Sequence, residues 1–97
     1  AIITGITVFV ILNPYRYSTE ILSTVNNKEI TDEYQVSLKD DIYGDVDIRY
    51  IDSIDDYMVH ADFKKSGETE LIIKTPEGKT VKYDLTIEMD TYTLEEQ

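Results

Sequence analysis

The chain has 97 residues, no cysteine, and 20 acidic against 9 basic residues, which give a formal net charge of −11. This length fits a single domain, and the lack of cysteine excludes disulfides, thiolate nucleophiles and cysteine-ligated metal centres. The excess of negative charge disfavours nucleic acids and anionic lipid headgroups as partners, because their phosphates repel it.

Residues 1–15 carry no charge and are rich in Ile and Val, whereas the chain after Arg16 is rich in charge. We therefore treat residues 1–17 as a separate N-terminal segment. One interpretation is the outer end of a membrane helix. Residues 1–12 would form about 18 Å of helix, whereas a full span needs about 20 residues. Residues 14–17 would then lie in the membrane interface.

A second interpretation of this segment is a buried strand, because residues 6–12 have the length and the Ile and Val content of a strand buried on both faces. Such a strand would belong to its own domain or, as in donor-strand pili, complete the sheet of a neighbouring subunit. A third interpretation, the apolar part of a secretion signal, is disfavoured because no small-residue cleavage site follows it.

From residue 18 the chain reads as short strands separated by turns. Residues 19–25 are weakly patterned, and Asn26 and Asn27 predict a turn, since asparagine tolerates the left-handed backbone region. Apolar and polar residues then alternate, with period two, over residues 34–38, 46–50 and 57–63. Polar or acidic breaks separate these strands at residues 39–45, 52–56 and 65–68.

The last two strands are the clearest. Residues 69–74 form a strand around Leu71 and Ile73, and Pro76 and Gly78 predict a tight turn after it. Every second residue from Val81 to Met89 is apolar, which fits one buried face of a strand and no helix face. Leu71 and Ile73 are expected to pair across this hairpin. Residues 91–97 are expected to be a frayed acidic tail.

Some six or seven short strands with turns every 8–14 residues predict an all-β fold, a small antiparallel β-sandwich over residues 18–90. Two sheets are needed, because one sheet with a wet face cannot bury the apolar side of every strand.

The C-terminal third resembles the late strands of bacterial immunoglobulin-like domains. The resemblance rests on residues 58–73, a short strand, a glycine turn and a Thr/Ile-rich strand, and on residues 75–88, a glycine hairpin and a long alternating strand. The tryptophan common in the third strand of such domains is missing, and Tyr50 is expected in its place. The resemblance implies an extracytoplasmic module, on a cell surface or tethered to a membrane, or a decoration of a phage particle. It carries no catalytic residues.

No residue pattern predicts catalysis. His60 is the only histidine, so neither a catalytic triad nor a histidine metal site has its partners. His60 alternates with Val59 and Ala61, and we expect it to be exposed on the polar face of its strand. We therefore predict a protein that is not an enzyme and has no small-molecule substrate, catalytic residue or bound cofactor.

Calcium is the one chemical alternative. Calcium takes six to eight oxygen ligands from carboxylates and carbonyls, and two acidic loops of a sandwich could supply them if they met at one end. The candidate ligands are Asp41, Asp45, Asp52, Asp55 and Asp56. The EF-hand spacing is missing, and Asp45 and Asp47 are expected to point outward from a strand. A solvated acidic rim is the competing interpretation.

Three functions therefore remain open. The first is a binding or assembly module of immunoglobulin-like fold on the outer side of a membrane, tethered through residues 1–14, whose partner is another protein or itself. The second is a structural subunit of a pilus-like filament or phage particle that uses residues 1–12 as an inserted strand. The third is a calcium-binding module. Exposed tyrosines such as Tyr43 and Tyr57 are candidates for a contact patch.

Overall fold

The computed structural model describes residues 17–97, which fold into antiparallel β-sheets with one short 3₁₀ helix. The elements in chain order are β1 (Tyr17–Leu22), β2 (Thr24–Val25), β3 (Lys28–Glu29), β4 (Gln35–Leu38), η1 (Asp41–Tyr43), β5 (Gly44–Ile51), β6 (Asp56–Phe63), β7 (Gly67–Lys74), β8 (Thr80–Ile87) and β9 (Tyr92–Glu96). The expected all-β class is confirmed.

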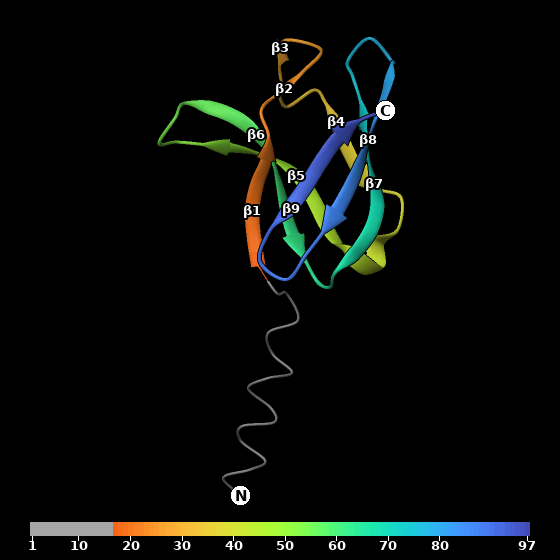
Figure 1. Ribbon diagram of the computed structural model, residues 1–97. Coiled ribbons are helices and arrows are strands. Elements are labelled where there is room, and N and C mark those ends of the chain that lie inside the picture. The colour runs from red at the N-terminus through yellow and green to blue at the C-terminus, as the bar shows by residue number, and fades with distance from the viewer. Residues whose placement is uncertain (1–16) are drawn as a thin grey trace, which may run out of the picture.

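Two main sheets form the body. One has three strands in the order β1-β6-β5, and the other has four in the order β4-β7-β8-β9; β2 and β3 form a small separate hairpin. Figure 1 shows β1 on one side and β7 on the other, with β9 passing between them in front. The element η1 carries the chain from the edge strand of the larger sheet to the edge strand of the smaller one.

The core lies between the two sheets and is built by the alternating residues of each strand. From the smaller sheet Val59, Ala61 and Phe63 are fully buried, and from the larger sheet every second residue of β7 and β8 points inward. The buried apolar residues among them are Leu71, Ile73, Tyr83, Leu85 and Ile87. A fully buried Leu or Ile side chain contributes about 1.5–3 kcal/mol relative to leaving it in water, so this face holds the sheets together.

The β7–β8 hairpin forms as the sequence predicts. Leu71 pairs with Tyr83 and Ile73 with Val81, and the turn is closed by a hydrogen bond from the Gly78 amide to the Thr75 carbonyl (2.9 Å). Gly78 has φ 89°, which a glycine adopts without strain. The turn after β2 is confirmed as well, because Asn26 and Asn27 both have positive φ.

Two expectations about the chain end are wrong. Residues 91–97 are not a frayed tail, since β9 pairs with β8 from Ile87↔Tyr92 to Tyr83↔Glu96. Met89 is 72% exposed, because β8 ends at Ile87 and the chain turns before Met89 can reach the core.

The first and last strands are tied by side chains. The Tyr17 hydroxyl donates a hydrogen bond to the Thr91 carbonyl, and the Tyr92 hydroxyl donates one to the Glu20 carbonyl (3.4 Å). The Phe63 ring lies between the two tyrosine rings, with centroids 5.0 Å from Tyr17 and 6.1 Å from Tyr92. These aromatic contacts close one side of the sandwich. Burial raises the pKa of the Tyr17 phenol, so its hydroxyl stays a donor.

Candidate functional site

The β5–β6 hairpin extends beyond the body of the sandwich, as the green hairpin in Figure 1 shows. Its two strands pair without interruption from Gly44↔Phe63 to Ile51↔Asp56. The half of the hairpin near Phe63 is covered by the opposite sheet, whereas the half near Ile51 is not. At the hairpin tip, the residues on the inner face of the smaller sheet are therefore not covered by the larger sheet.

Two tyrosines occupy this uncovered face. Tyr50 and Tyr57 are directly paired across the strands, and their rings meet edge to face with centroids 5.2 Å apart. Tyr57 is half-buried and packs on the edge of the core, while Tyr50 is 47% exposed. The expectation that Tyr50 replaces a core tryptophan is wrong, because the strand carries Tyr50 past the point where the larger sheet ends.

The turn of the hairpin is fixed by its own hydrogen bonds. The amides of Ile54 and Asp55 donate to the carbonyls of Ile51 and Asp52 at 3.2 and 3.3 Å, and Asp55 has φ 52°. The Tyr50 hydroxyl donates a hydrogen bond to the Asp55 carboxylate. This bond raises the pKa of the Tyr50 phenol, because the carboxylate favours the protonated hydroxyl. Ile54, at the apex, is 54% exposed.

The predicted calcium ligands do not meet. Asp41 lies in η1 and Asp45 near the start of β5, whereas Asp52, Asp55 and Asp56 surround the hairpin turn at the other end of β5. Asp45 and Asp52 are seven residue steps apart along β5, which is about 23 Å at 3.3 Å per residue. The two acidic loops therefore lie at opposite ends of β5. Within residues 17–97 no group of three acidic or histidine side chains has an arrangement that could hold a metal ion.

Several of these aspartates have other contacts. Asp45 and Asp47 point outward, as expected; Asp45 lies 3.8 Å from the Lys64 ammonium and Asp47 lies 3.1 Å from the Arg49 guanidinium. Asp40, beside η1, accepts a hydrogen bond from the Thr69 hydroxyl (3.0 Å). The two acidic segments thus belong to different surroundings.

His60 is buried, with 8% of its surface exposed, and the expectation of an exposed histidine is wrong. It lies on the outer face of the central strand β6, where neighbouring side chains cover it. Its Nδ1 is 3.4 Å from the Glu20 carboxylate on β1, and its Nε2 is 3.1 Å from the Asp62 carboxylate. A hydrogen bond from Ser18, then the bond and charge of His60, lower the pKa of Asp62. The group ties β1 to β6.

This histidine cluster does not contain a nucleophile–base pair. A nucleophile–base pair needs a reacting group within hydrogen-bond reach and an adjacent space for substrate. The Ser18 hydroxyl donates its hydrogen bond to Asp62 and not to His60. Four hollows on the part of the chain that the structure describes are lined by other residues and not by His60.

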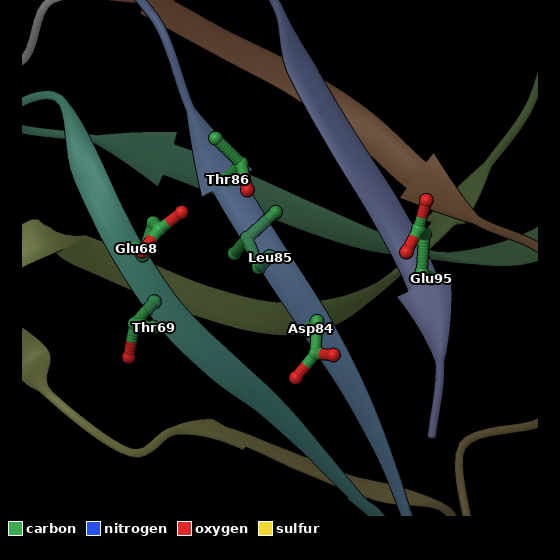
Figure 2. Close-up of a pocket in the computed structure, with 6 residues that line it drawn as sticks. All are labelled: Glu68, Thr69, Asp84, Leu85, Thr86 and Glu95. Atoms are coloured by element: carbon green, nitrogen blue, oxygen red, sulfur yellow. The ribbon is translucent and has the colours of Figure 1, made fainter.

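The outer face of the larger sheet carries a shallow hollow of about 390 Å³. Figure 2 shows Glu68 and Thr69 on β7, three residues of β8, and Glu95 on β9 around it; those of β8 are Asp84, Leu85 and Thr86. The Gln97 amide donates hydrogen bonds to Asp84 (2.8 Å) and, beside the hollow, to Glu70 (3.0 Å). The residues that line this hollow are mostly acidic or polar and include no aromatic side chain, unlike those of the hairpin tip.

Of the tyrosines proposed for a contact patch, only Tyr57 lies at the hairpin. Tyr43 packs against Gly67, where a Cβ would come within 2.2 Å of its ring, and Lys65 lies 5.3 Å from the Tyr43 ring centroid. Ile54 was not singled out from the sequence. An apolar residue between Asp52 and Asp55 in a predicted turn was the available signal.

Comparison with models of protein families, with curated proteins and with solved structures gave no match. Within the part of the chain that the structure describes, no helix has the length and apolar character needed to cross a membrane.

Proposed function

We propose that this chain is a non-enzymatic binding or assembly module of immunoglobulin-like fold. It works outside the cytoplasm, is tethered to a membrane through residues 1–14, and contacts a protein partner with the β5–β6 hairpin. The observation that carries the proposal is the hairpin tip, where Tyr50 and Ile54 are exposed to solvent on a turn that is fixed by backbone hydrogen bonds. Large apolar side chains gathered on a projecting element are typical of interaction sites.

The place of the hairpin relative to β1 supports this arrangement. Tyr17, the first residue of β1, pairs with Phe63 at one end of β6, and Asp56 pairs with Ile51 at the other. The seven residue steps between Phe63 and Asp56 correspond to about 23 Å. A module held at Tyr17 would thus carry its contact surface at the far end of the same strand pair, away from the membrane.

The division into sheets of three and four strands supports the immunoglobulin-like assignment, whereas the strand orders β1-β6-β5 and β4-β7-β8-β9 differ from the A-B-E-D and C-F-G orders of that fold. Facing antiparallel sheets of three and four strands are found in seven-stranded immunoglobulin domains. Sandwiches of this kind hold contact residues on loops at their ends, which agrees with a role in binding.

A vesicle flotation experiment tests the tether. The full chain and a chain lacking residues 1–14 are reconstituted with neutral phosphatidylcholine vesicles, so that the charge of −11 plays no part. We expect the full chain to float with the vesicles and the shorter chain to remain at the bottom. Recovery of the full chain at the bottom of the gradient would refute the tether.

Site-specific photo-crosslinking in the cells that make the protein tests the contact. A photoreactive residue replaces Ile54 or, as the matched control, Thr93, which is exposed on β9. We expect a discrete adduct from position 54 that disappears when Tyr50→Ala is added, and none from position 93. Equal labelling from both positions would contradict a binding role for the hairpin.

A filament or phage subunit is the second candidate, and a groove between the sheets favours it. Edge strands β4 and β5 lie next to each other without pairing. A hollow of about 330 Å³ between them is lined by Val36, Leu38 and Val46. An inserted strand from residues 1–12 of another copy would use the free backbone groups of both edges.

Sedimentation of the full chain separates the two candidates. In detergent the tethered module is expected to sediment as a single copy. A filament subunit forms large particles with and without detergent, and these particles are lost when residues 1–12 are deleted.

A further inference from the structure

The hairpin tip combines exposed aromatic surface with unpaired negative charge. Tyr50 and Ile54 are about half exposed, and Asp52 and Asp55 lie beside them in the turn. Residues 50–58 contain three aspartates and no lysine or arginine. Among the described residues no basic side chain forms an ion pair with Asp52, Asp55 or Asp56.

The nearest arginine does not neutralise the tip. Arg49 points to the opposite face of the hairpin, where its guanidinium lies 3.1 Å from Asp47 and 3.7 Å from Asp62. The negative charge of the tip is therefore left for a cation supplied by another molecule.

Arginine matches this surface better than other side chains. Its planar guanidinium stacks on an aromatic ring and at the same time donates two parallel hydrogen bonds to a carboxylate. Tyr50 places its ring on the uncovered face, and its hydroxyl holds the Asp55 carboxylate beside that ring. A lysine ammonium would meet the same charge but could not form the stacked, bidentate contact.

A second copy of the chain is a poor occupant. Each tip carries Asp52, Asp55 and Asp56, and each chain has a net charge of −11. Two tips brought together would place six carboxylates at one interface, where like charges repel and suppress association. Charge complementarity therefore selects a basic protein.

We propose that the tip of the β5–β6 hairpin docks an arginine-bearing segment of a basic protein partner, with the guanidinium stacked on Tyr50 and paired with Asp55. This inference rests on the proposed binding function and names the partner chemistry for the same hairpin.

The test is a nuclear magnetic resonance titration of the ¹⁵N-labelled full chain in detergent. The probes are the capped peptides Gly-Arg-Gly-Arg-Gly and, as a matched control, Gly-Lys-Gly-Lys-Gly. We expect amide shifts concentrated at residues 49–58, with the arginine peptide binding about two- to fivefold more tightly than the lysine peptide. Tyr50→Ala should remove this preference, whereas Tyr50→Phe, which keeps the ring, should retain most of it.

The acidic hollow on the larger sheet supplies an internal control. It has carboxylates at Glu68, Asp84 and Glu95 but no exposed aromatic ring, so plain charge attraction would shift it as much as the hairpin. Shifts spread over both faces, equal binding of the two peptides, or no effect of Tyr50→Ala would each overturn the proposal. Self-association of the free chain through residues 50–57 would do so as well.

The crosslinking and titration results together distinguish a wrong partner chemistry from a wrong binding function. A position-54 crosslink together with no arginine preference means that the hairpin binds a partner of other chemistry. Absence of the crosslink removes the binding function itself.

Discussion

Gly44 gives the sharpest test of the strand register. It begins β5 with φ 156° and ψ −168°, a region that is essentially restricted to glycine. It also lies directly against β6: a Cβ at this position would be 2.4 Å from the Asp62 carbonyl oxygen and 3.1 Å from the Phe63 Cα. Gly44→Ala therefore meets both backbone strain and a clash with atoms that cannot rotate away.

The magnitude follows from these two contributions. Forcing alanine into this backbone region costs about 1–3 kcal/mol, and the overpacking costs about 1–3 kcal/mol more. The sum, about 2–6 kcal/mol, is a large part of the stability of a domain of this size, about 5–15 kcal/mol. We expect Gly44→Ala to lower Tm by at least about 10 °C.

Gly78→Ala is the matched control. Gly78 also has a positive φ, 89°, but a Cβ there meets nothing within 4 Å, so alanine costs only the strain of about 1–2 kcal/mol. Urea unfolding followed by circular dichroism gives both free energies. Gly44→Ala should exceed Gly78→Ala by at least about 1 kcal/mol. Equal costs would mean that Gly44 does not approach β6 as described.

Three further outcomes are expected. Ser18→Ala removes the hydrogen bond that chiefly lowers the pKa of Asp62. A lowered carboxyl pKa stabilises the fold at pH values above the pKa of the unfolded chain, and this stabilisation is lost as pH falls through the pKa of the folded state. The variant should therefore be less stable at pH 7 and unchanged in stability near pH 2; an equal loss at both pH values would contradict this. Ile87→Ala should cost about 2–5 kcal/mol and Met89→Ala less than about 0.5 kcal/mol by urea unfolding; comparable costs would show that β8 runs on to Met89. Deleting residues 92–97 removes β9 and uncovers the buried side chains of β8, so a melting curve should show loss of the folded state. An unchanged Tm would mean that these residues form a frayed tail and not a strand.

The regular strands were predictable because their alternation reports which face is buried. Leu71 and Ile73 pair across the hairpin as expected, and Val81, Tyr83, Leu85 and Ile87 contribute to one face of β8. Alternation says nothing about where the opposite sheet ends. That is why Tyr50, on the inward side of its strand, was expected in the core and lies in water.

The residues whose surroundings were wrongly predicted depend on contacts with strands that are distant in the sequence. His60 is buried because Glu20 of β1 and Asp62 of its own strand close over a polar face, and no local pattern predicts that cover. For β9 a signal existed, since Tyr92 and Leu94 alternate with polar residues, but the acidic end favoured a tail. The hairpin site was predicted only in part. Asp52, Asp55 and Asp56 were named as candidate metal ligands, whereas the exposed Ile54 at the apex was not identified.

The two ends of the described fold lie at opposite poles, which bears on how it would carry mechanical load. Tyr17 begins β1 beside Phe63, whereas the Gln97 amide donates to the Lys82 carbonyl near the far end of β8 (3.0 Å). Figure 1 shows the start of β1 and the C-terminus at opposite ends of the fold. Tension applied between these points pulls β1 along β6 in one sheet and β9 along β8 in the other. The hydrogen bonds between these strands are then loaded in shear, all at once, instead of opening one after another. Such a connection gives way only when the whole strand slips, so we expect the domain to transmit force without stretching.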